Sequence, residues 1–492
     1  MTRIGELERK YPTIPREMLV KYEVWDRGLR YTTDLDKVSE WMPPSGSYQT
    51  KHEDQTLQEM VAEQPHRLKE GYFLRPREFT MPSTLGCHIY LKTTSPYTVR
   101  EIADGKFALF EGEEKVDVDI YFPKAKPWEE PTTTSRGTPI KRFVGNDSNC
   151  FYVYAGRHCE YFPLGLQCKF CNFNASQQDA GCVGLNRPVM ENVDDVVDAL
   201  RIRSEQVRLV EGRTDMGGFM DPETEAKVFC RWLDKAFKAM NYKPHMHAHS
   251  QAATRNQLQR LKDSGLDSYT FHMEVGDPLL FPEICPGKAQ HAPYEGWIEA
   301  MANGLEVFGE GRVSVKLIVG LTLIPENGHK TWQEARDSHI KFALSMIKMG
   351  VLPINGALAL PPGSVYGADP ALQKRLPPTD YMFDLALAQH EAMTECGLYD
   401  KLDKLAYCGL DNAPMGHYAT DLGVLSKYGN YGNWMADTVP EELNWPLQFL
   451  KSIGLPASSG MVRPTPSTSE RESSSTTAAT SRQPMSSSAS RE

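Results

Sequence analysis

The chain has 492 residues, of which 40% are hydrophobic, and a net charge of −10 at neutral pH. This length is enough for two or three domains, or for one large barrel with additions. The acidic balance, without a basic stripe, argues against nucleic acid as a partner, and no run of about 18 apolar residues is present to span a bilayer.

The beginning of the sequence, Met1 to Lys10, is too polar for a signal peptide. The ten cysteines are scattered apart from one group, which fits a reducing compartment better than a disulfide framework. We therefore expect a cytoplasmic protein with neither a membrane nor a nucleic acid among its partners.

Residues 1–140 read as a separate N-terminal α+β region of unknown role, with a cover or a substrate-recognition element as a guess. A helix is predicted over 55–68, and Asp104-Gly105 predicts a type I′ hairpin turn. Alternating valines at 116 and 118 predict a half-buried strand that continues to Phe122. The Pro- and Thr-rich stretch 124–139 reads as a linker.

Three cysteines follow a short predicted strand at 151–155. Cys159, Cys168 and Cys171 are spaced C-x8-C-x2-C. Thiolates this close repel one another, so such a group usually binds a metal or forms a disulfide. An iron–sulfur cube normally takes four thiolates, so three would leave one iron open to another ligand. The alternative is a structural zinc site, for which His158 or Cys150 could supply the fourth ligand.

From 145 to 400 the pattern alternates between strand and helix, which predicts a parallel α/β fold. Asp221 before Pro222 and the Thr331–Glu334 capping box predict helix starts, and Gly350 predicts a helix end. Further strands are expected at 206–210, 244–250, 268–275, 313–320 and 354–360. Six βα units make a partial (βα)6 TIM-like barrel, whose active site would lie at the carboxyl ends of the strands.

Several polar or small residues stand near those strand ends. Gly217 and Gly218 follow the second strand, His249 ends the third, and His272 and Glu274 end the fourth. Each has a plain structural explanation: paired glycines often form turns, and Glu274 could be a surface carboxylate.

The third predicted strand carries His245, His247 and His249, which a period of two places on one face. We expect these side chains to line the barrel as hydrogen-bonded groups more readily than to bind a metal. Ile318, near the end of the fifth strand, is equally consistent with core packing.

The motif Cys168-Lys169-Phe170-Cys171, the spaced glycine pair and the βα units together resemble the radical S-adenosylmethionine (radical SAM) superfamily. The chain departs from the usual C-x3-C first gap, and Gly217-Gly218 lacks the glutamate that often follows it. The resemblance covers about 145–400 and does not identify a subfamily.

The resemblance implies that Cys159, Cys168 and Cys171 ligate three irons of a [4Fe-4S] cluster and that S-adenosyl-L-methionine chelates the fourth. Reductive cleavage would then yield a 5′-deoxyadenosyl radical that abstracts hydrogen from a small-molecule substrate. The resemblance also implies a set of cofactor-binding positions: Gly217, Gly218, His249, His272, Glu274 and Ile318. Of these, His249 could contact the substrate instead of the cofactor.

An electron donor, either a reductase or a flavodoxin or ferredoxin, is a further expected partner. The absence of a D-x-H-x-x-G motif argues against a cobalamin-dependent methyltransferase, and the absence of a second cysteine set argues against peptide maturation with an auxiliary cluster. The expected reaction is therefore a rearrangement, a fragmentation or a dehydrogenation, catalysed by a lyase, isomerase or oxidoreductase. Two other interpretations stay open: an iron–sulfur electron-transfer or sensor protein with Cys150 or Cys182 as fourth ligand, and a zinc-stabilised, non-catalytic binding protein.

The end of the chain divides into two further predicted segments. Residues 401–457 are expected to form a C-terminal extension that packs on the barrel. Residues 458–492 are rich in Ser and Thr and cannot bury a core, so we expect them to be disordered.

Overall fold

A computed structural model of the chain describes residues 2–41, 54–69, 72–74, 76, 78–124, 132–140, 143–147, 150–153, 159–182, 193–215, 218–407 and 417–456. Several predicted features lie outside these residues: His158, Gly217, positions 125–131 of the expected linker at 124–139, and the expected disordered tail at 458–492. The side chains of Cys150 and Cys182 are likewise not described. The division into four segments stays a prediction.

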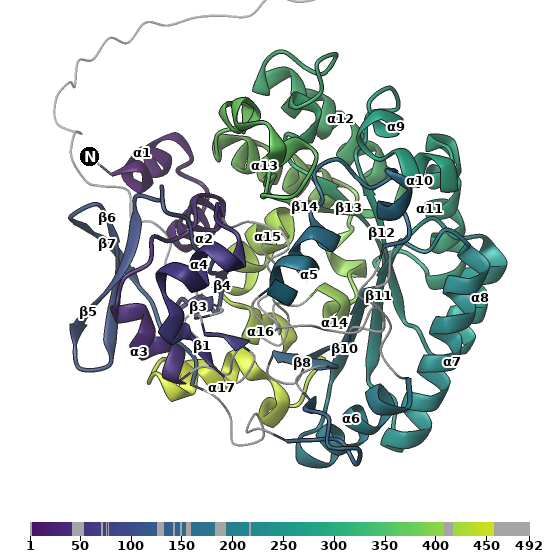
Figure 1. Cartoon of the computed structure of the whole chain (residues 1–492), viewed down its shortest axis with the longest axis horizontal. Helices are drawn as coiled ribbons and strands as arrows, with labels where there is room; N and C mark the ends of the chain where they lie inside the picture. The colour runs from purple at the N-terminus through teal and green to yellow at the C-terminus, as the bar shows by residue number, and fades with distance from the viewer. Residues whose placement is uncertain are drawn as a thin grey trace, which may run out of the picture.

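The largest sheet contains seven strands in the order β14-β13-β12-β11-β10-β9-β8 (Figure 1). Strands β9 to β14 run parallel and follow one another in sequence order, while β8 pairs with β9 antiparallel at the edge. The expected partial (βα)6 barrel is therefore confirmed. The strands are β8 (Val144–Asp147), β9 (Cys150–Val153), β10 (Glu211–Asp215), β11 (His245–Ser250), β12 (Ser268–Glu274), β13 (Val313–Ile318) and β14 (Leu352–Gly356).

The second barrel strand was predicted in the wrong place. The expected strand at 206–210 is the end of α6 (Val193–Gln206) and a loop, and the strand begins at Glu211. The sequence pattern did not indicate this strand, because Glu211 and Arg213 are charged residues in a buried position. They are buried as an ion pair, with 2.7 Å between Arg213 Nε and Glu211 Oε1. The sixth strand also ends at Gly356, earlier than expected.

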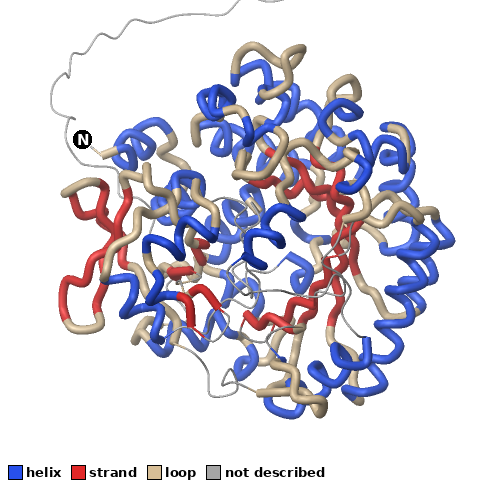
Figure 2. Tube along the Cα trace, viewed as in Figure 1, coloured by secondary structure: helices blue, strands red, loops and turns tan. Residues whose placement is uncertain are grey.

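Helices cover the outer face of the sheet (Figures 1 and 2). Their predicted ends are confirmed: Asp221 accepts from the backbone of Glu223, Thr331 and Glu334 form the capping box, and Gly350 ends its helix with a φ of 98°. The helices that follow α6 are α7 (Pro222–Met240), α8 (Arg255–Asp263), α9 (Phe281–Ile284), α10 (Pro286–His291), α11 (Tyr294–Phe308), α12 (Trp332–Met349) and α13 (Asp380–Glu395), and α5 (Phe173–Cys182) precedes it.

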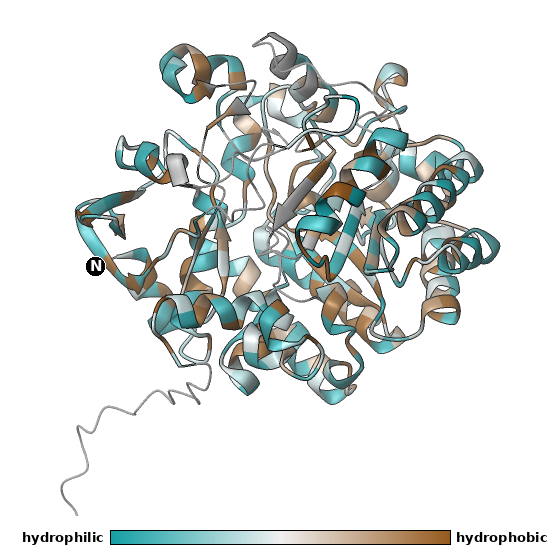
Figure 3. Cartoon of the chain, turned by 90° about the horizontal axis from the view of Figure 1, so that it is seen from below, coloured by the Kyte–Doolittle hydropathy of each residue, from teal (hydrophilic) through white to brown (hydrophobic). Residues whose placement is uncertain are grey.

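The two faces of the barrel strands differ in polarity. In β12, Tyr269 and Phe271 point outward, and Tyr269 stacks on Phe308 of α11. Thr270 alternates with them and forms hydrogen bonds with His247 and Ser314 on the opposite face. The outer helices accordingly carry mixed polar and apolar surfaces (Figure 3).

The described residues of the N-terminal region form helices α1 to α4 and small antiparallel sheets. The Asp104-Gly105 hairpin and the strand with buried Val116 and Val118 are confirmed. Gly105 has a φ of 67° but Asp104 has no positive φ, so the turn is not of type I′. The elements are α1 (Arg3–Lys10), α2 (Arg16–Arg27), α3 (Asp34–Trp41), α4 (Leu57–Glu63), β1 (Leu68–Lys69), β2 (Tyr72–Phe73), β3 (Glu78–Thr80), β4 (Gly86–His88), β5 (Tyr97–Ala103), β6 (Lys106–Glu111) and β7 (Glu114–Asp119).

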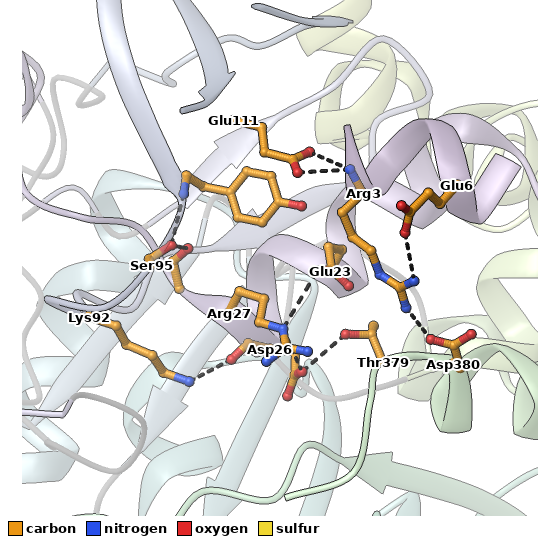
Figure 4. Close-up of polar contacts among 12 residues, drawn as sticks. Arg3, Glu6, Glu23, Asp26, Arg27, Lys92, Ser95, Glu111, Thr379 and Asp380 are labelled. Atoms are coloured by element: carbon orange, nitrogen blue, oxygen red, sulfur yellow. Dashed lines mark hydrogen bonds and ion pairs between the residues drawn. The ribbon is translucent and has the colours of Figure 1, made fainter. Parts of the chain in front are cut away.

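Polar contacts join this region to the barrel helices (Figure 4). The backbone N–H of Arg3 donates to Glu111, while the Arg3 guanidinium contacts Asp380 at the start of α13. Beside it, Thr379 Oγ1 donates to Asp26 Oδ2 over 3.1 Å. The N-terminal region is thus fixed against α13 by contacts between residues more than 350 positions apart in the sequence.

Helices α14 (Lys404–Tyr407), α15 (Tyr418–Tyr428) and α16 (Tyr431–Met435) lie between the N-terminal region and the sheet, and α17 (Trp445–Ser452) lies below the N-terminal region (Figure 1). Tyr407 of α14 lies edge-on to His247 on the inner face of the sheet. Within the described residues, no helix has the length and apolar character needed to cross a membrane.

Candidate functional site

The cysteine loop lies at the carboxyl end of β9. Its described part runs from Cys159 through a short 3-10 turn at 162–164 to Cys171, and Gly165 adopts a left-handed conformation after that turn. The three thiols lie close enough to influence one another electrostatically. Burial, reinforced by Cys168 and Cys171, raises the pKa of the Cys159 thiol to about 12.

Backbone hydrogen bonds fix this loop to the ends of neighbouring strands. The N–H of Glu160 donates to Gly218 after β10 (2.7 Å), and the N–H of Lys169 donates to Ile284 after β12 (2.9 Å). The carbonyl of Lys169 accepts from the N–H of Tyr366 after β14, also over 2.9 Å. The loop therefore sits at the edge where the parallel strands end, as in barrel active sites.

Gly218 lies directly against the first cysteine. It has a φ of 84°, and a β-carbon there would lie 2.6 Å from Cys159 Sγ and 2.8 Å from Cys159 Cα. Both the backbone conformation and the close approach require glycine. Gly217 lies outside the described residues, so the structure places only one glycine of the predicted pair beside the loop.

Glu274 ends β12 in a strained conformation, with a φ of 72° that is uncommon for a non-glycine residue. The register with β13 shifts just before it, between Phe271 and Glu274. The Lys288 ammonium donates to Glu274 Oε1 over 2.8 Å and also to the backbone carbonyl of His272. Glu274 is therefore a buried, ion-paired carboxylate and not a surface one.

The charges of this pair reinforce each other. Burial opposes ionisation of Glu274, but Lys288 and His272 outweigh it and hold the pKa of the carboxyl below its ordinary value. Burial likewise disfavours the charged form of Lys288, but Glu274 and the nearby Cys168 and Cys285 thiols raise the pKa of the ammonium above its ordinary value. Both groups are charged at neutral pH.

A fourth cysteine lies beside the loop. Cys285, between α9 and α10, is fully buried, and its segment is bonded to the loop through the carbonyl of Ile284 and the N–H of Lys169. The nearby Cys285 side chain is the main cause of a lowered pKa of the Cys168 thiol, with a further contribution from Lys288. Sequence reasoning treated Cys285 as scattered, because 114 positions separate it from Cys171. The sequence feature that could have indicated its position is the segment Cys285-Pro286-Gly287-Lys288, which follows shortly after the end of a barrel strand.

The three histidines of β11 lie on the inner face. His247 hydrogen-bonds to Ser268 Oγ (2.6 Å) and Thr270 Oγ1 (2.7 Å), and burial lowers its pKa, so it stays neutral. This agrees with the expected role as a hydrogen-bonded lining group. His245 contacts Asp403 over 3.0 Å near the start of the strand, away from the loop.

Two of the predicted cofactor positions, His249 and His272, come together. Their ring centroids are 5.2 Å apart, and His272 Nδ1 lies 3.8 Å from Glu274 Oε1. Ile318 of β13 lies near Glu274, since both line a small cavity of about 20 Å³ together with Gly276, His339 and other residues. Four predicted positions on β11, β12 and β13 are thus gathered at one edge of the sheet.

Sequence reasoning missed a buried carboxyl group below the loop. Glu225 of α7 accepts from Gln251 Nε2 (2.9 Å) and from the Ser250 hydroxyl, and burial raises its pKa to about 7. The amide oxygen of Gln251 accepts from the Tyr161 hydroxyl over 2.9 Å. Glu225 is therefore connected to the cysteine loop through Gln251. No spacing pattern links these positions, which come from three separate elements.

These side chains fit an iron–sulfur cluster chemically. Cysteine thiolates are the usual ligands of such clusters, and each binds a separate iron. Among the residues that the structure describes, no three His, Cys, Asp or Glu side chains are arranged to share one metal ion. Lys288 supplies a cation beside Cys168 that would balance negative charge on a bound cluster.

Comparison with known proteins gives one curated relative, the bacteriochlorophyllide c C-7(1)-hydroxylase of Chlorobaculum limnaeum. The two are 26% identical over 203 residues, which are 38% of this chain and 49% of that protein. The match thus spans about half the length of the relative. No protein-family model matches the chain.

The chain resembles radical SAM enzymes. This confirms the resemblance expected from the cysteine loop and the run of βα units. Members of this superfamily use a [4Fe-4S] cluster and S-adenosylmethionine.

Solved structures of radical SAM enzymes also match in part. HydG from Carboxydothermus hydrogenoformans is 14% identical with a TM-score of 0.35, over 61% of this chain and 77% of that one. Methylornithine synthase (PylB) is 12% identical with a TM-score of 0.34, over 50% of this chain and 68% of that one. These scores are too low to establish a shared fold by themselves.

Proposed function

We propose that the protein is a radical SAM enzyme that uses a [4Fe-4S] cluster and S-adenosylmethionine to abstract hydrogen from a small-molecule substrate. The observation that carries the proposal is the three-cysteine loop at the carboxyl edge of a six-stranded parallel barrel, with Gly218 on one side and Glu274 on the other. When bound, the cluster and S-adenosylmethionine supply a 5′-deoxyadenosyl radical.

In this proposal Cys159, Cys168 and Cys171 would hold the [4Fe-4S] cluster through three of its irons, and S-adenosylmethionine would bind at the fourth. Gly218 keeps space beside Cys159, and its buried carbonyl, which accepts from the N–H of Glu160, would use its second lone pair to accept from the cofactor amino group. Gly217 would share that role.

The proposed cofactor site extends along the strand ends. Glu274, oriented by Lys288, would accept from a ribose hydroxyl or the methionine ammonium. His249 and His272 lie beside it and would contact cofactor or substrate, and Ile318 would pack on the adenine ring. Tyr407 of α14, which lies edge-on to His247 on the inner face, would help to keep water away from reactive species.

Hydrogen abstraction at this site is compatible with lyase, isomerase and oxidoreductase chemistry. The curated relative is a hydroxylase by name, and this favours an oxidoreductase acting on a carbon–hydrogen bond. An external electron donor, a reductase or a flavodoxin or ferredoxin, would reduce the cluster.

The experiment that tests the proposal begins with anaerobic reconstitution of the full chain with iron and sulfide. We expect four irons per chain, and, after dithionite reduction and addition of S-adenosylmethionine, slow release of 5′-deoxyadenosine detected by chromatography. A cluster without any cleavage would contradict the proposal. The Cys168→Ala variant is the negative control, since it should hold no [4Fe-4S] cluster and release no 5′-deoxyadenosine.

One observation favours a second candidate, an iron–sulfur electron-transfer or sensor protein. Cys285 is a fourth, fully buried cysteine whose segment is bonded to the loop through Ile284 and Lys169, and it would complete a protein-ligated cluster. The side chains of the two residues expected for this role, Cys150 and Cys182, are not among those that the structure describes. In that case the cluster spectrum would not change on addition of S-adenosylmethionine.

A further inference from the structure

We infer that Gln251 is a positioning residue whose side-chain amide joins the cysteine loop to the segment that follows β10 and thereby holds the proposed ligand Cys159 in place beside Gly218. The inference deepens the proposed function and rests on it. Gln251 follows β11 directly and is not one of the predicted cofactor positions.

The Gln251 amide is buried between three segments of the chain, and the side chain is only 2% exposed. Its oxygen accepts from the Tyr161 hydroxyl in the cysteine loop over 2.9 Å. Its nitrogen donates to the Phe219 carbonyl after β10 over 2.8 Å and to Glu225 Oε2 of α7 over 2.9 Å. Both amide hydrogens and the amide oxygen are therefore bonded, and they connect the three segments at one point.

The partners of this amide determine its orientation. A peptide carbonyl can only accept a hydrogen bond, so the amide nitrogen faces Phe219 whether or not Glu225 carries a proton. The amide oxygen then faces Tyr161, whose hydroxyl donates. The backbone is fixed as well, because the main-chain carbonyl of Gln251 accepts from the Tyr269 hydroxyl of β12 over 2.9 Å.

The two segments that the amide joins carry the closest contact of the site. Tyr161 is two positions after Cys159, and Phe219 follows Gly218, where a β-carbon would lie 2.6 Å from Cys159 Sγ. A main-chain bond from the N–H of Glu160 to the Gly218 carbonyl also joins these segments. The buried amide adds a side-chain bridge, so it restrains the first proposed ligand relative to the end of β10.

Tyr161 connects the amide rigidly to the loop. Its ring is 4% exposed and lies against α10, where a β-carbon on Gly287 would be 2.5 Å from it. Its main-chain carbonyl accepts from the N–H of Leu166 over 2.9 Å. The hydroxyl is also 3.4 Å from the Phe219 carbonyl, a longer contact than its bond to Gln251. Without the amide, the hydroxyl would turn to that carbonyl and draw the loop out of its position.

The test uses the reconstituted full chain and measures the rate at which the cluster loses iron to a chelator without S-adenosylmethionine. Tyr161→Phe removes only the hydroxyl that bonds to the amide, and Gln251→Met replaces the amide by an apolar group of similar length. We expect both variants to lose iron about tenfold faster than the wild type, because residues that orient a metal ligand contribute about this factor to metal affinity. The electron paramagnetic resonance spectrum of the reduced cluster should change in both, since a ligand sulfur moves.

Gln389→Met is the matched control for the loss of a buried amide. Gln389 of α13 is 1% exposed, but its amide oxygen accepts from Asn355 of β14 over 3.1 Å. This variant should lower the melting temperature, as Gln251→Met does, while iron release and spectrum stay as in the wild type. The double variant Tyr161→Phe/Gln251→Met should release iron no faster than Gln251→Met alone, because both changes remove the same bond.

Two results would overturn the inference. One is iron release and a spectrum like those of the wild type in Tyr161→Phe and Gln251→Met. The other is equally fast release from Gln389→Met, which would make general destabilisation the cause. If Gln251→Met does not fold, Tyr161→Phe decides, because it keeps the packed ring and removes one oxygen. These readouts need no cofactor cleavage, so a wild type that builds the cluster and cleaves nothing would reject the proposed function without rejecting this inference.

Discussion

Gly218 and Cys159 are in such close contact that no side chain fits between them. A β-carbon on Gly218 would lie 2.6 Å from Cys159 Sγ, and Gly218 accepts the hydrogen bond of Glu160, the residue after that cysteine. The end of β10 therefore determines where the first proposed ligand lies. The glycine pair looks like a simple turn in the sequence, but Gly218 lies directly against the cysteine loop.

The first prediction concerns this contact. Gly218→Ala should prevent assembly of a full cluster, because the new methyl group displaces the Cys159 side chain and its backbone. The measurement is iron per chain after reconstitution. Gly397→Ala is the matched control: it has a similar φ of 63° but nothing within 4 Å of its β-carbon, so it should cost only about 1 kcal/mol of backbone strain. Equal iron content in both variants would show that cluster assembly does not depend on Gly218.

The second prediction concerns the carboxylate after β12. Glu274→Gln should weaken binding of S-adenosylmethionine about tenfold while iron content stays at four per chain, because loss of one charged hydrogen bond costs about 1.5 kcal/mol. Affinity is measured by equilibrium binding to the reconstituted protein. Glu283→Gln, in the neighbouring α9, removes a carboxylate whose ion-pair contact with Lys169 is a looser 3.8 Å, and it should bind normally. Unchanged affinity in Glu274→Gln would exclude this residue from the cofactor site.

The third prediction concerns pH. Burial raises the pKa of Glu225 from 4.5 to about 7, so the folded chain binds a proton more tightly than the unfolded chain. The associated stability is fully present below pH 4.5 and falls as pH rises, until it is lost above about pH 7. The full difference is on the order of 3 kcal/mol.

Glu225→Gln keeps a neutral group of the same shape and should flatten this dependence. Urea unfolding of the wild type and the variant at several pH values between these limits gives the comparison. A variant with the same slope as the wild type would show that Glu225 is not the titrating group. Thr394→Val, at an exposed position on α13, serves as a control that should leave the slope unchanged.

The fourth prediction concerns the contact between the N-terminal region and α15. Lys21 Nζ donates to Asp421 Oδ2 over 2.7 Å in a buried pair, and the hydroxyls of Tyr22 and Tyr431 bond to the same carboxylate. Lys21→Met should destabilise the fold by about 3 kcal/mol, since it leaves a buried charge without its cation. Thermal unfolding measures the loss. Lys427→Met removes a solvent-exposed partner of Asp400 and should have no measurable effect.

Much of the architecture follows from local patterns in the sequence. Asp221, the Thr331–Glu334 pair and Gly350 mark helix ends because a cap is satisfied by residues within one turn. The alternation of Tyr269 and Phe271 with Thr270 likewise marks a strand with two different faces. The C-x-x-C spacing places Cys168 and Cys171 together through the loop alone.

The sequence by itself therefore determined the succession of strands and helices, the three-cysteine loop and the edge of the barrel on which it lies. Tertiary structure alone decided the rest. It located β10 at Glu211, where Glu211 and Arg213 are buried because they form an ion pair with each other along the strand. It also brought Cys285, Lys288 and Glu225 to the loop from distant positions. Contacts of this kind leave no periodic trace, since the partners meet only when the parallel strands align their carboxyl ends.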